Sequence, residues 1–207
     1  MSANIIVSGV GGQGVVTTGL LISRAAIAGG NHVVMSEIHG LAQRGGSVSV
    51  DVRIGDYHAP MIPDGDADLV IGLEPIEAER VLTRAGPGTK VIMSREKMAP
   101  VSLGIQGKEY PDVDQIISEI SREFLVYAID AITLAREAGN ARTVNVVVVG
   151  FALGLGLLEI PEKHIVEEMN IMFPGKLSGV NLKALELGKA AGKSNTLRWN
   201  PVPADSS

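Results

Sequence analysis

The feature that most constrains the fold lies near the N-terminus, where a glycine-rich hexapeptide joins two apolar segments of different periodicity. Residues Asn4–Ser8 (NIIVS) form a short apolar run, and residues Val15–Ala28 (VVTTGLLISRAAIA) repeat apolar positions at the spacing of a helix. The hexapeptide GVGGQG, Gly9–Gly14, stands between them. A strand, a tight glycine turn and a helix in this order are typical of the opening unit of a parallel α/β fold.

The rest of the chain continues this alternation. Further strands are predicted over His32–Ile38, Ser47–Ile54, Ala67–Leu73, Lys90–Ser94 and Leu125–Ile129. One further helix is predicted from Pro75 to about Ala85, and another ends at Ala138 with Asp130 as its N-terminal cap. The remaining helices are predicted over Val144–Leu158, Glu162–Phe173 and Leu182–Ala191. The pattern predicts a three-layer α/β/α sandwich around a mainly parallel, mixed, Rossmann-like sheet.

The position of two strands in the sheet is also predicted. The segment His32–Ile38 is expected to run parallel to the first strand, because a crossover helix separates the two. In Ser47–Ile54, apolar residues alternate with polar ones, which indicates one wetter face. We therefore expect Ser47–Ile54 to lie toward an edge of the sheet, and a GPG break at 86–88 to precede the strand that begins at Lys90.

Composition limits the domain count and the class of partner. The 207 residues contain enough apolar material for one globular domain, predicted over residues 1–192, with a polar tail over residues 193–207. The net charge of −5 disfavours nucleic acid and anionic membrane surfaces, which require a basic face. Residues 144–160 form an apolar stretch that is shorter than the ~20 residues a bilayer requires, and the N-terminus shows no secretory signal. A cytoplasmic location is expected.

Two residue types exclude several kinds of chemistry. The chain has no cysteine, so it cannot hold an iron–sulfur cluster through thiolates or use a cysteine nucleophile. Its four histidines, at positions 32, 39, 58 and 164, lack the paired spacing of metal ligands. We therefore predict that this chain holds no metal ion, and we assign no cofactor to this chain alone.

The glycine loop is nevertheless a candidate binding site. Gly9, Gly11 and Gly14 have the G-x-G-x-x-G spacing, and Gly12 and Gln13 complete the loop. Glycines permit a tight turn and the close approach of a ligand, while the free amides at the start of a helix favour an anion. These five residues are therefore predicted to contact a cofactor.

The glycine spacing alone leaves alternatives open. In a dinucleotide-binding fold, an acid about 20 residues beyond the loop holds a ribose, and Glu37 stands at about this spacing. A stand-alone NAD(P)-dependent oxidoreductase is therefore one alternative. Another is that the glycines serve only helix–strand packing. A P-loop is excluded, because Val15 and Val16 stand where lysine and serine or threonine are required.

A second polar motif follows the predicted strand that ends near Ile38. The segment Glu37–Gly46 (EIHGLAQRGG) places a carboxylate, an imidazole, an amide and a guanidinium on one glycine-bounded loop. Open parallel sheets bind ligands at the carboxyl ends of their strands, so both loops are expected to face one crevice. Arg44 could hold a phosphate or a carboxylate, or could pair internally with Glu37, and His39 could move a proton near neutrality.

The two motifs together resemble the gamma subunit or gamma domain of 2-oxoacid:ferredoxin oxidoreductases, and most closely the small, beta subunit of the indolepyruvate type. The similarity runs through SGVGGQGVVTTGLLISRAA, EIHGLAQRGGSVSVDVRIG, IPDG, ADLVIGLEPIEAER and AGNARTVNVVVVG, and covers about three quarters of the chain. The matching loop positions beyond the first loop are Glu37, His39, Gly40, Gln43, Arg44, Gly45 and Gly46.

The resemblance implies a helper role in a larger enzyme. Related enzymes oxidatively decarboxylate a 2-oxoacid with coenzyme A to give an acyl-CoA, carbon dioxide and reduced ferredoxin. Thiamine diphosphate and the iron–sulfur clusters are expected in a large partner subunit, which agrees with the absence of cysteine here. His39 and Arg44 would support catalysis, and the other loop residues would face the partner or coenzyme A. A module that only senses coenzyme A or a nucleotide is a further alternative.

Overall fold

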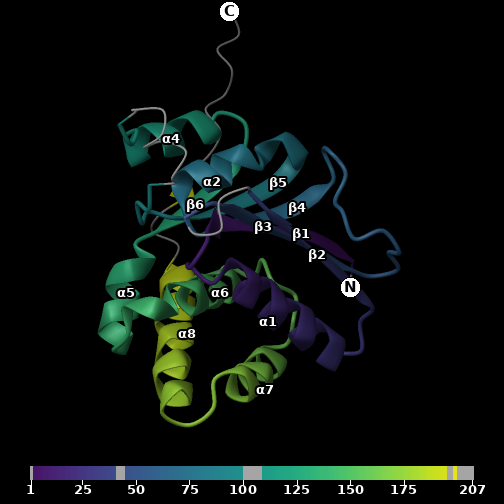
Figure 1. Cartoon of the computed structure of the whole chain (residues 1–207), viewed down its shortest axis with the longest axis vertical. Helices are drawn as coiled ribbons and strands as arrows, with labels where there is room; N and C mark the ends of the chain where they lie inside the picture. Colours follow the sequence, from purple (N-terminus) through teal and green to yellow (C-terminus); the bar gives the residue numbers. More distant parts are fainter. Residues whose placement is uncertain (1, 41–44, 100–108, 195–197, 200–207) are drawn as a thin grey trace, which may run out of the picture.

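The computed structural model describes residues 2–40, 45–99, 109–194 and 198–199. Within these residues a seven-stranded sheet lies between two layers of helices (Figure 1). The strands are Ala3–Val10 (β1), Val33–His39 (β2), Ser47–Ile54 (β3), Ala67–Gly72 (β4), Ala85–Ser94 (β5), Leu125–Ile129 (β6) and Arg198–Trp199 (β7). The helices are Val15–Ala28 (α1), Pro75–Arg80 (α2), Val113–Ile120 (α4), Ala131–Ala138 (α5), Val144–Gly154 (α6), Glu162–Met172 (α7) and Lys176–Ser194 (α8), with 3₁₀ turns at Leu82–Arg84 (η1) and Ala141–Thr143 (η2).

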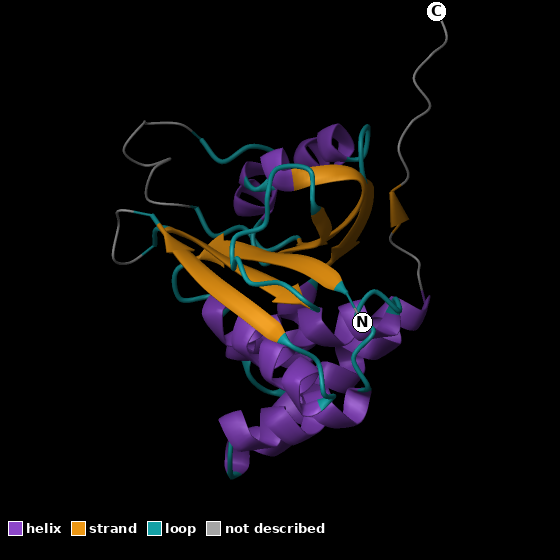
Figure 2. Cartoon of the chain, turned by 90° about the vertical axis from the view of Figure 1, so that its right-hand side faces the viewer, coloured by secondary structure: helices purple, strands orange, loops and turns teal. Residues whose placement is uncertain are grey.

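The strand order is β2-β3-β1-β4-β5-β6-β7. The pairs β1–β4, β4–β5 and β5–β6 are parallel, whereas β3 pairs antiparallel with both β1 and β2, and β7 pairs antiparallel with β6. Figures 1 and 2 show α2 and α4 on one face of the sheet and the remaining helices on the other. The predicted α/β/α sandwich with a mixed sheet is therefore confirmed.

Each face of the sheet packs its own apolar core. The side chains of β1 alternate between the two cores, with Ile5 and Val7 facing α1 and α6 and Ile6 facing α2. Helix α6 is buried at every residue from Val144 to Ala152, as predicted for this apolar segment. Among the described residues, no helix is both long and apolar enough to cross a bilayer.

The predicted wetter face of Ser47–Ile54 is wrong. Strand β3 lies toward one edge of the sheet, as predicted, but between β2 and β1, and all its residues from Val48 to Ile54 are buried. The polar side chains of β3 can be buried because other side chains satisfy them with hydrogen bonds. Arg84 bonds both carboxylate oxygens of Asp51 at 2.6 and 2.7 Å, and Arg53 donates to Asn4 Oδ1 at 3.0 Å. Strand β2 runs in the same direction as β1, as predicted, but it forms the edge.

Three element boundaries also differ from the predictions. Helix α2 ends at Arg80, and a 3₁₀ turn replaces its predicted last residues. Strand β5 begins at Ala85, so the GPG sequence lies inside a strand that contains a register shift beside β4. Helix α8 extends from Lys176 to Ser194, and within it Gly188 and Gly192 are sites of close packing rather than ends.

Candidate functional site

The candidate site lies at the carboxyl edge of the parallel strands, between β1 and β4. From β1 the chain crosses through α1 toward β2, and from β4 it crosses through α2 on the opposite face toward β5. The strand order therefore reverses between β1 and β4. Ligands of open α/β sheets bind in the crevice that such a reversal creates.

The two predicted loops meet at this edge. The amide of Gly11 donates to the carbonyl of Gly46 at 2.9 Å, and Val10 at the end of β1 is in register with Ser47 at the start of β3. Gly45 has a φ of 67°, a conformation that glycine adopts without strain. Antiparallel pairing of β3 with β1 thus brings the second loop to the first, although the two are distant in sequence.

The inner side of the glycine loop is filled by the protein itself. The Gln13 side chain is buried; its Oε1 accepts from the Val10 amide at 2.8 Å, and its Nε2 donates to the Leu73 carbonyl at 3.1 Å. A Cβ on Gly14 would lie 2.9 Å from the side chain of Asn145 on α6. Gln13 therefore joins the loop to the end of β4, and its predicted contact with a cofactor has no support in this geometry.

The outer side of the glycine loop is open. A hollow of about 240 Å³ is lined by Val10, Gly11, Gly12, Gly14, Val15, Val16, Thr17 and Val48. Gly12 has a φ of 107°, and a Cβ built there would meet no atom within 4 Å. The start of α1 has no side-chain cap to satisfy its first amides, and its first residues, Val15, Val16 and Thr17, line this hollow. The hollow could accept an anionic group.

Glu37 and His39 lie away from this hollow. Glu37 is in register with Val50 of β3, which is itself in register with Val7 of β1, so two strand spacings, about 10 Å, separate Glu37 from β1. The Glu37 carboxylate lies 3.1 Å from His39 Nε2, and both side chains are exposed. A ribose-binding acid belongs on the strand beside β1, so Glu37 does not fit that role.

The remaining predicted loop residues divide into two groups. The Gly40 amide donates to the Ser47 carbonyl at 2.8 Å, and this bond closes the connection between β2 and β3. Gln43 and Arg44 lie outside the described residues.

Two buried carboxylates at the same edge were missed by the sequence interpretation. Glu74 and Glu77, at the start of α2, are 0% and 1% exposed. Glu74 caps the helix by accepting from the Glu77 amide at 2.9 Å, and Tyr110 donates to its other oxygen. Ser47, beside the second loop, donates to Glu77 Oε2 at 2.5 Å. The sequence feature that could have indicated them is EPIE, which directly follows a buried strand and is a helix-capping pattern with proline in the first turn.

Burial raises the pKa of Glu74 above its ordinary value of 4.5, and the nearby Glu77 carboxylate adds to the increase, although the hydrogen bond from Tyr110 opposes it. A carboxyl with a raised folded pKa stabilises the fold below its unfolded pKa, and this contribution is lost as the pH rises through the folded pKa. We therefore expect the free energy of unfolding of the native chain, relative to Glu74→Gln, to fall as the pH rises. Urea unfolding of both proteins between pH about 4 and about 7 measures this difference; a difference that grows with pH would contradict the expectation.

The described residues hold no group of three or more histidine and acidic side chains arranged to bind a metal ion. The carboxyl edge thus combines the backbone amides of the glycine loop, the buried carboxylates Glu74 and Glu77, and two adjoining loops. Fold and site together define an α/β protein with an open hollow beside the glycine loop, at the carboxyl edge of its sheet.

Comparison with known proteins identifies the family. The model of the pyruvate ferredoxin/flavodoxin oxidoreductase family matches residues 4–191. The chain is 43% identical over 189 residues to the indolepyruvate oxidoreductase subunit IorB of Archaeoglobus fulgidus, with 91% of this chain and 94% of that subunit aligned. This chain therefore belongs to the pyruvate ferredoxin/flavodoxin oxidoreductase family.

Solved structures show the same fold. The gamma subunit of a keto/oxoacid ferredoxin oxidoreductase from Geobacter sulfurreducens has a TM-score of 0.69 at 21% identity, covering 93% of this chain and 99% of that one. The 2-oxoglutarate:ferredoxin oxidoreductase from Magnetococcus marinus, solved with 2-oxoglutarate, coenzyme A and succinyl-CoA, has a TM-score of 0.72 at 23% identity. It covers 93% of this chain, which corresponds to 31% of that longer chain.

Proposed function

We propose that this chain is the cluster-free subunit of a 2-oxoacid:ferredoxin oxidoreductase of the indolepyruvate type. The observation that carries the proposal is the end-to-end match with a separate small subunit, which spans 94% of that subunit at 43% identity. In this role the chain supports the CoA-dependent oxidative decarboxylation of an aryl pyruvate to an acyl-CoA, carbon dioxide and reduced ferredoxin.

The chemistry of the reaction requires a larger partner. Oxidative decarboxylation uses thiamine diphosphate as an electron sink and iron–sulfur clusters as an electron path. This chain has no cysteine to hold a cluster. The partner subunit therefore carries both cofactors and passes electrons to ferredoxin, and this chain is inactive alone.

The geometry supports a role for this chain at the carboxyl edge. The uncapped start of α1 and the open side of Gly12 suit a phosphate group of coenzyme A, and Arg44 supplies a guanidinium on the adjoining loop. Glu37 and His39 are exposed on the edge strand, where they contact the partner subunit. The alternative of an autonomous NAD(P)-dependent enzyme is disfavoured, because β3 separates Glu37 from β1.

The first test is native mass spectrometry of the tagged chain, recovered anaerobically from its own cells. We expect a heteromer with a large subunit that retains thiamine diphosphate and iron–sulfur clusters, and activity only when both subunits are present. A homo-oligomer that carries a nicotinamide nucleotide, or a large subunit that is equally active without this chain, would overturn the proposal.

Gly11→Val tests whether the glycine loop is a site of close approach. A Cβ on Gly11 would lie 3.7 Å from its nearest atoms in the chain, which is ordinary contact, so the matched variant Gly11→Ala should fold with little loss of thermal stability. If a ligand or the partner approaches this backbone, then assembly or kcat/KM for coenzyme A should fall by at least about tenfold. Intact assembly and kinetics would mean that the loop serves packing alone.

Arg44→Ala tests the proposed contact with coenzyme A. Loss of a charge-assisted hydrogen bond to a phosphate costs about 1 to 3 kcal/mol, so the KM for coenzyme A in the reconstituted complex should rise by roughly 5- to 150-fold. Arg142→Ala, an exposed arginine before α6, is the control and should leave this KM unchanged. An unchanged KM in Arg44→Ala would assign Arg44 to the loop or to the subunit contact.

A further inference from the structure

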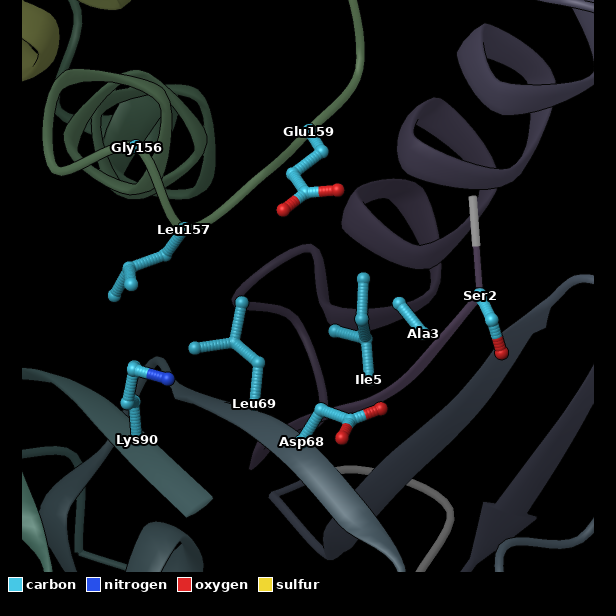
Figure 3. A pocket seen from close by; sticks show the side chains of 9 residues that line it. All are labelled: Ser2, Ala3, Ile5, Asp68, Leu69, Lys90, Gly156, Leu157 and Glu159. Atoms are coloured by element: carbon cyan, nitrogen blue, oxygen red, sulfur yellow. The ribbon is translucent and has the colours of Figure 1, made fainter. Parts of the chain in front are cut away.

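The amino edge of the parallel strands has a hollow of about 230 Å³, bounded by Lys90 on β5 and Glu159 before α7 (Figure 3). Its apolar residues Ile5 and Leu69 are 1% and 3% exposed, so they offer almost no surface to a ligand, and its charged side chains face solvent. This hollow therefore defines no class of ligand. The side edge of the sheet beyond β6 is more informative, because the structure shows which segment covers it.

Strand β6 has no protection of its own against pairing with another chain. Without β7 it would end the sheet, and a strand at the edge of a sheet presents a row of unpaired backbone amides and carbonyls. Natural edge strands often carry charges or proline that discourage such pairing. The opposite edge strand, β2, has the exposed charged or polar residues Glu37 and His39. The sequence of β6, LVYAI, contains neither a charge nor a proline.

A short C-terminal strand covers the β6 edge instead. Strand β7 pairs antiparallel with β6, with Trp199 opposite Val126 and Arg198 opposite Tyr127 (Figure 2). Helix α8 ends at Ser194, so only three residues connect it to β7. A connection this short keeps the C-terminal segment at a high local concentration beside β6. The pairing therefore forms within one chain without a large interface.

The cover that β7 provides is an addition to the family domain and can open. The residues that match the family model end at 191, so β7 lies outside them. Among the described residues, only two of the five positions of β6 pair with β7. Pro201 and Pro203 lack a backbone N–H and cannot donate to a ladder, so the sequence limits how far this pairing can lengthen. A pairing of two residues can open while the rest of the fold stays intact.

We propose that the β6 edge is a self-association surface, and that the C-terminal segment, residues 195–207, is a detachable cover that keeps it from pairing with β6 of a second copy of this chain. When β7 leaves, antiparallel pairing of two β6 strands continues the sheet across two molecules. A second copy fits this edge, because LVYAI is an uncharged segment of high β propensity that pairs with itself without like-charge repulsion. The proposal uses only the edge of the sheet, so it does not depend on the function proposed above.

The test is the full-length double variant Arg198→Pro/Trp199→Pro, which removes both backbone amides of β7. Of the Val126 and Tyr127 amides, the one that points toward β7 should exchange with solvent at least about tenfold faster, as measured by NMR. Sedimentation velocity should show concentration-dependent association beyond that of the native chain, while the Tm stays close to the native value. Unchanged exchange, unchanged sedimentation or a large loss of Tm would each overturn the proposal, the last because β7 would then be an integral part of the fold.

Two further variants identify the surface that associates. Ala204→Pro adds a proline to the same segment outside β7 and should exchange and sediment like the native chain. Leu125→Lys, added to the double variant, places a charge on the half-buried first residue of β6, so two paired β6 strands would repel each other and the association should be reversed. Association that persists with Leu125→Lys, or that appears in Ala204→Pro, would mean that β6 is not the associating edge.

Discussion

Gly188→Ala is expected to lower the free energy of unfolding by about 3 kcal/mol, because α6 and α8 pack with their backbones in contact. A Cβ on Gly188 would lie 2.0 Å from the Val147 carbonyl oxygen of α6, and one on Gly150 would lie 2.1 Å from the Leu185 carbonyl oxygen of α8. Gly154 and Gly192 continue the same contact. Backbone atoms cannot rotate away as a side chain can, so the helices must separate. Thermal unfolding should show a Tm decrease of roughly 6 to 12 °C.

Gly179→Ala is the matched control in the same helix. Gly179 is exposed and a Cβ built there meets no atom within 4 Å, so alanine should raise the helix propensity without any clash. We expect a gain of up to about 1 kcal/mol. Equal Tm values for Gly188→Ala and Gly179→Ala would show that α6 and α8 do not meet at this contact.

Arg84→Leu is expected to lower the free energy of unfolding by about 3 to 5 kcal/mol. The Asp51 side chain is fully buried in β3, and the Arg84 guanidinium bonds both of its oxygens at 2.6 and 2.7 Å. The Ile62 amide also donates to Asp51 at 2.9 Å, but it carries no compensating charge. Removing the guanidinium therefore leaves a buried carboxylate without its counter-ion. Urea unfolding measures the loss.

Two further variants identify the cause of that loss. Arg122→Leu removes an exposed arginine after α4 and should change the stability by less than about 0.5 kcal/mol. The double variant Asp51→Leu/Arg84→Leu removes both charges and should recover part of the stability, because an apolar pair needs no counter-ion. If the double variant loses as much as the sum of both single variants, then the interaction between Asp51 and Arg84 does not account for the effect.

The elements with local signals were predicted well. Helix α1 spans Val15–Ala28 as expected, since the preceding glycines supply the positive φ angles of the turn. Asp130 accepts from the Thr133 amide and Gly139 ends α5 in a left-handed conformation, as a capping acid and a terminating glycine predict. These capping and turn interactions join residues only a few positions apart in the sequence. They therefore form in the same way in any tertiary arrangement of the chain.

The candidate site was predicted in part. The contact between Gly11 and Gly46 confirms that the two loops share one edge. The role of each loop residue could not be predicted from the sequence. Gln13 turns inward and bonds Leu73, and Glu37 lies two strands from β1. The direction of a polar side chain depends on which buried amide or carbonyl lies within reach, and that partner can be far away in sequence.

The sequence by itself determined the family, the alternation of strands and helices and the turn at the glycine loop, because propensity, periodicity and glycine spacing are local properties. The tertiary structure alone decided that β3 enters between β1 and β2, that Asp51 is buried against Arg84, and that α6 meets α8 through glycine backbones. An alternating strand has the same pattern at an edge and inside a sheet when its polar residues find buried partners. Those partners come from distant segments, and only the folded chain brings them together.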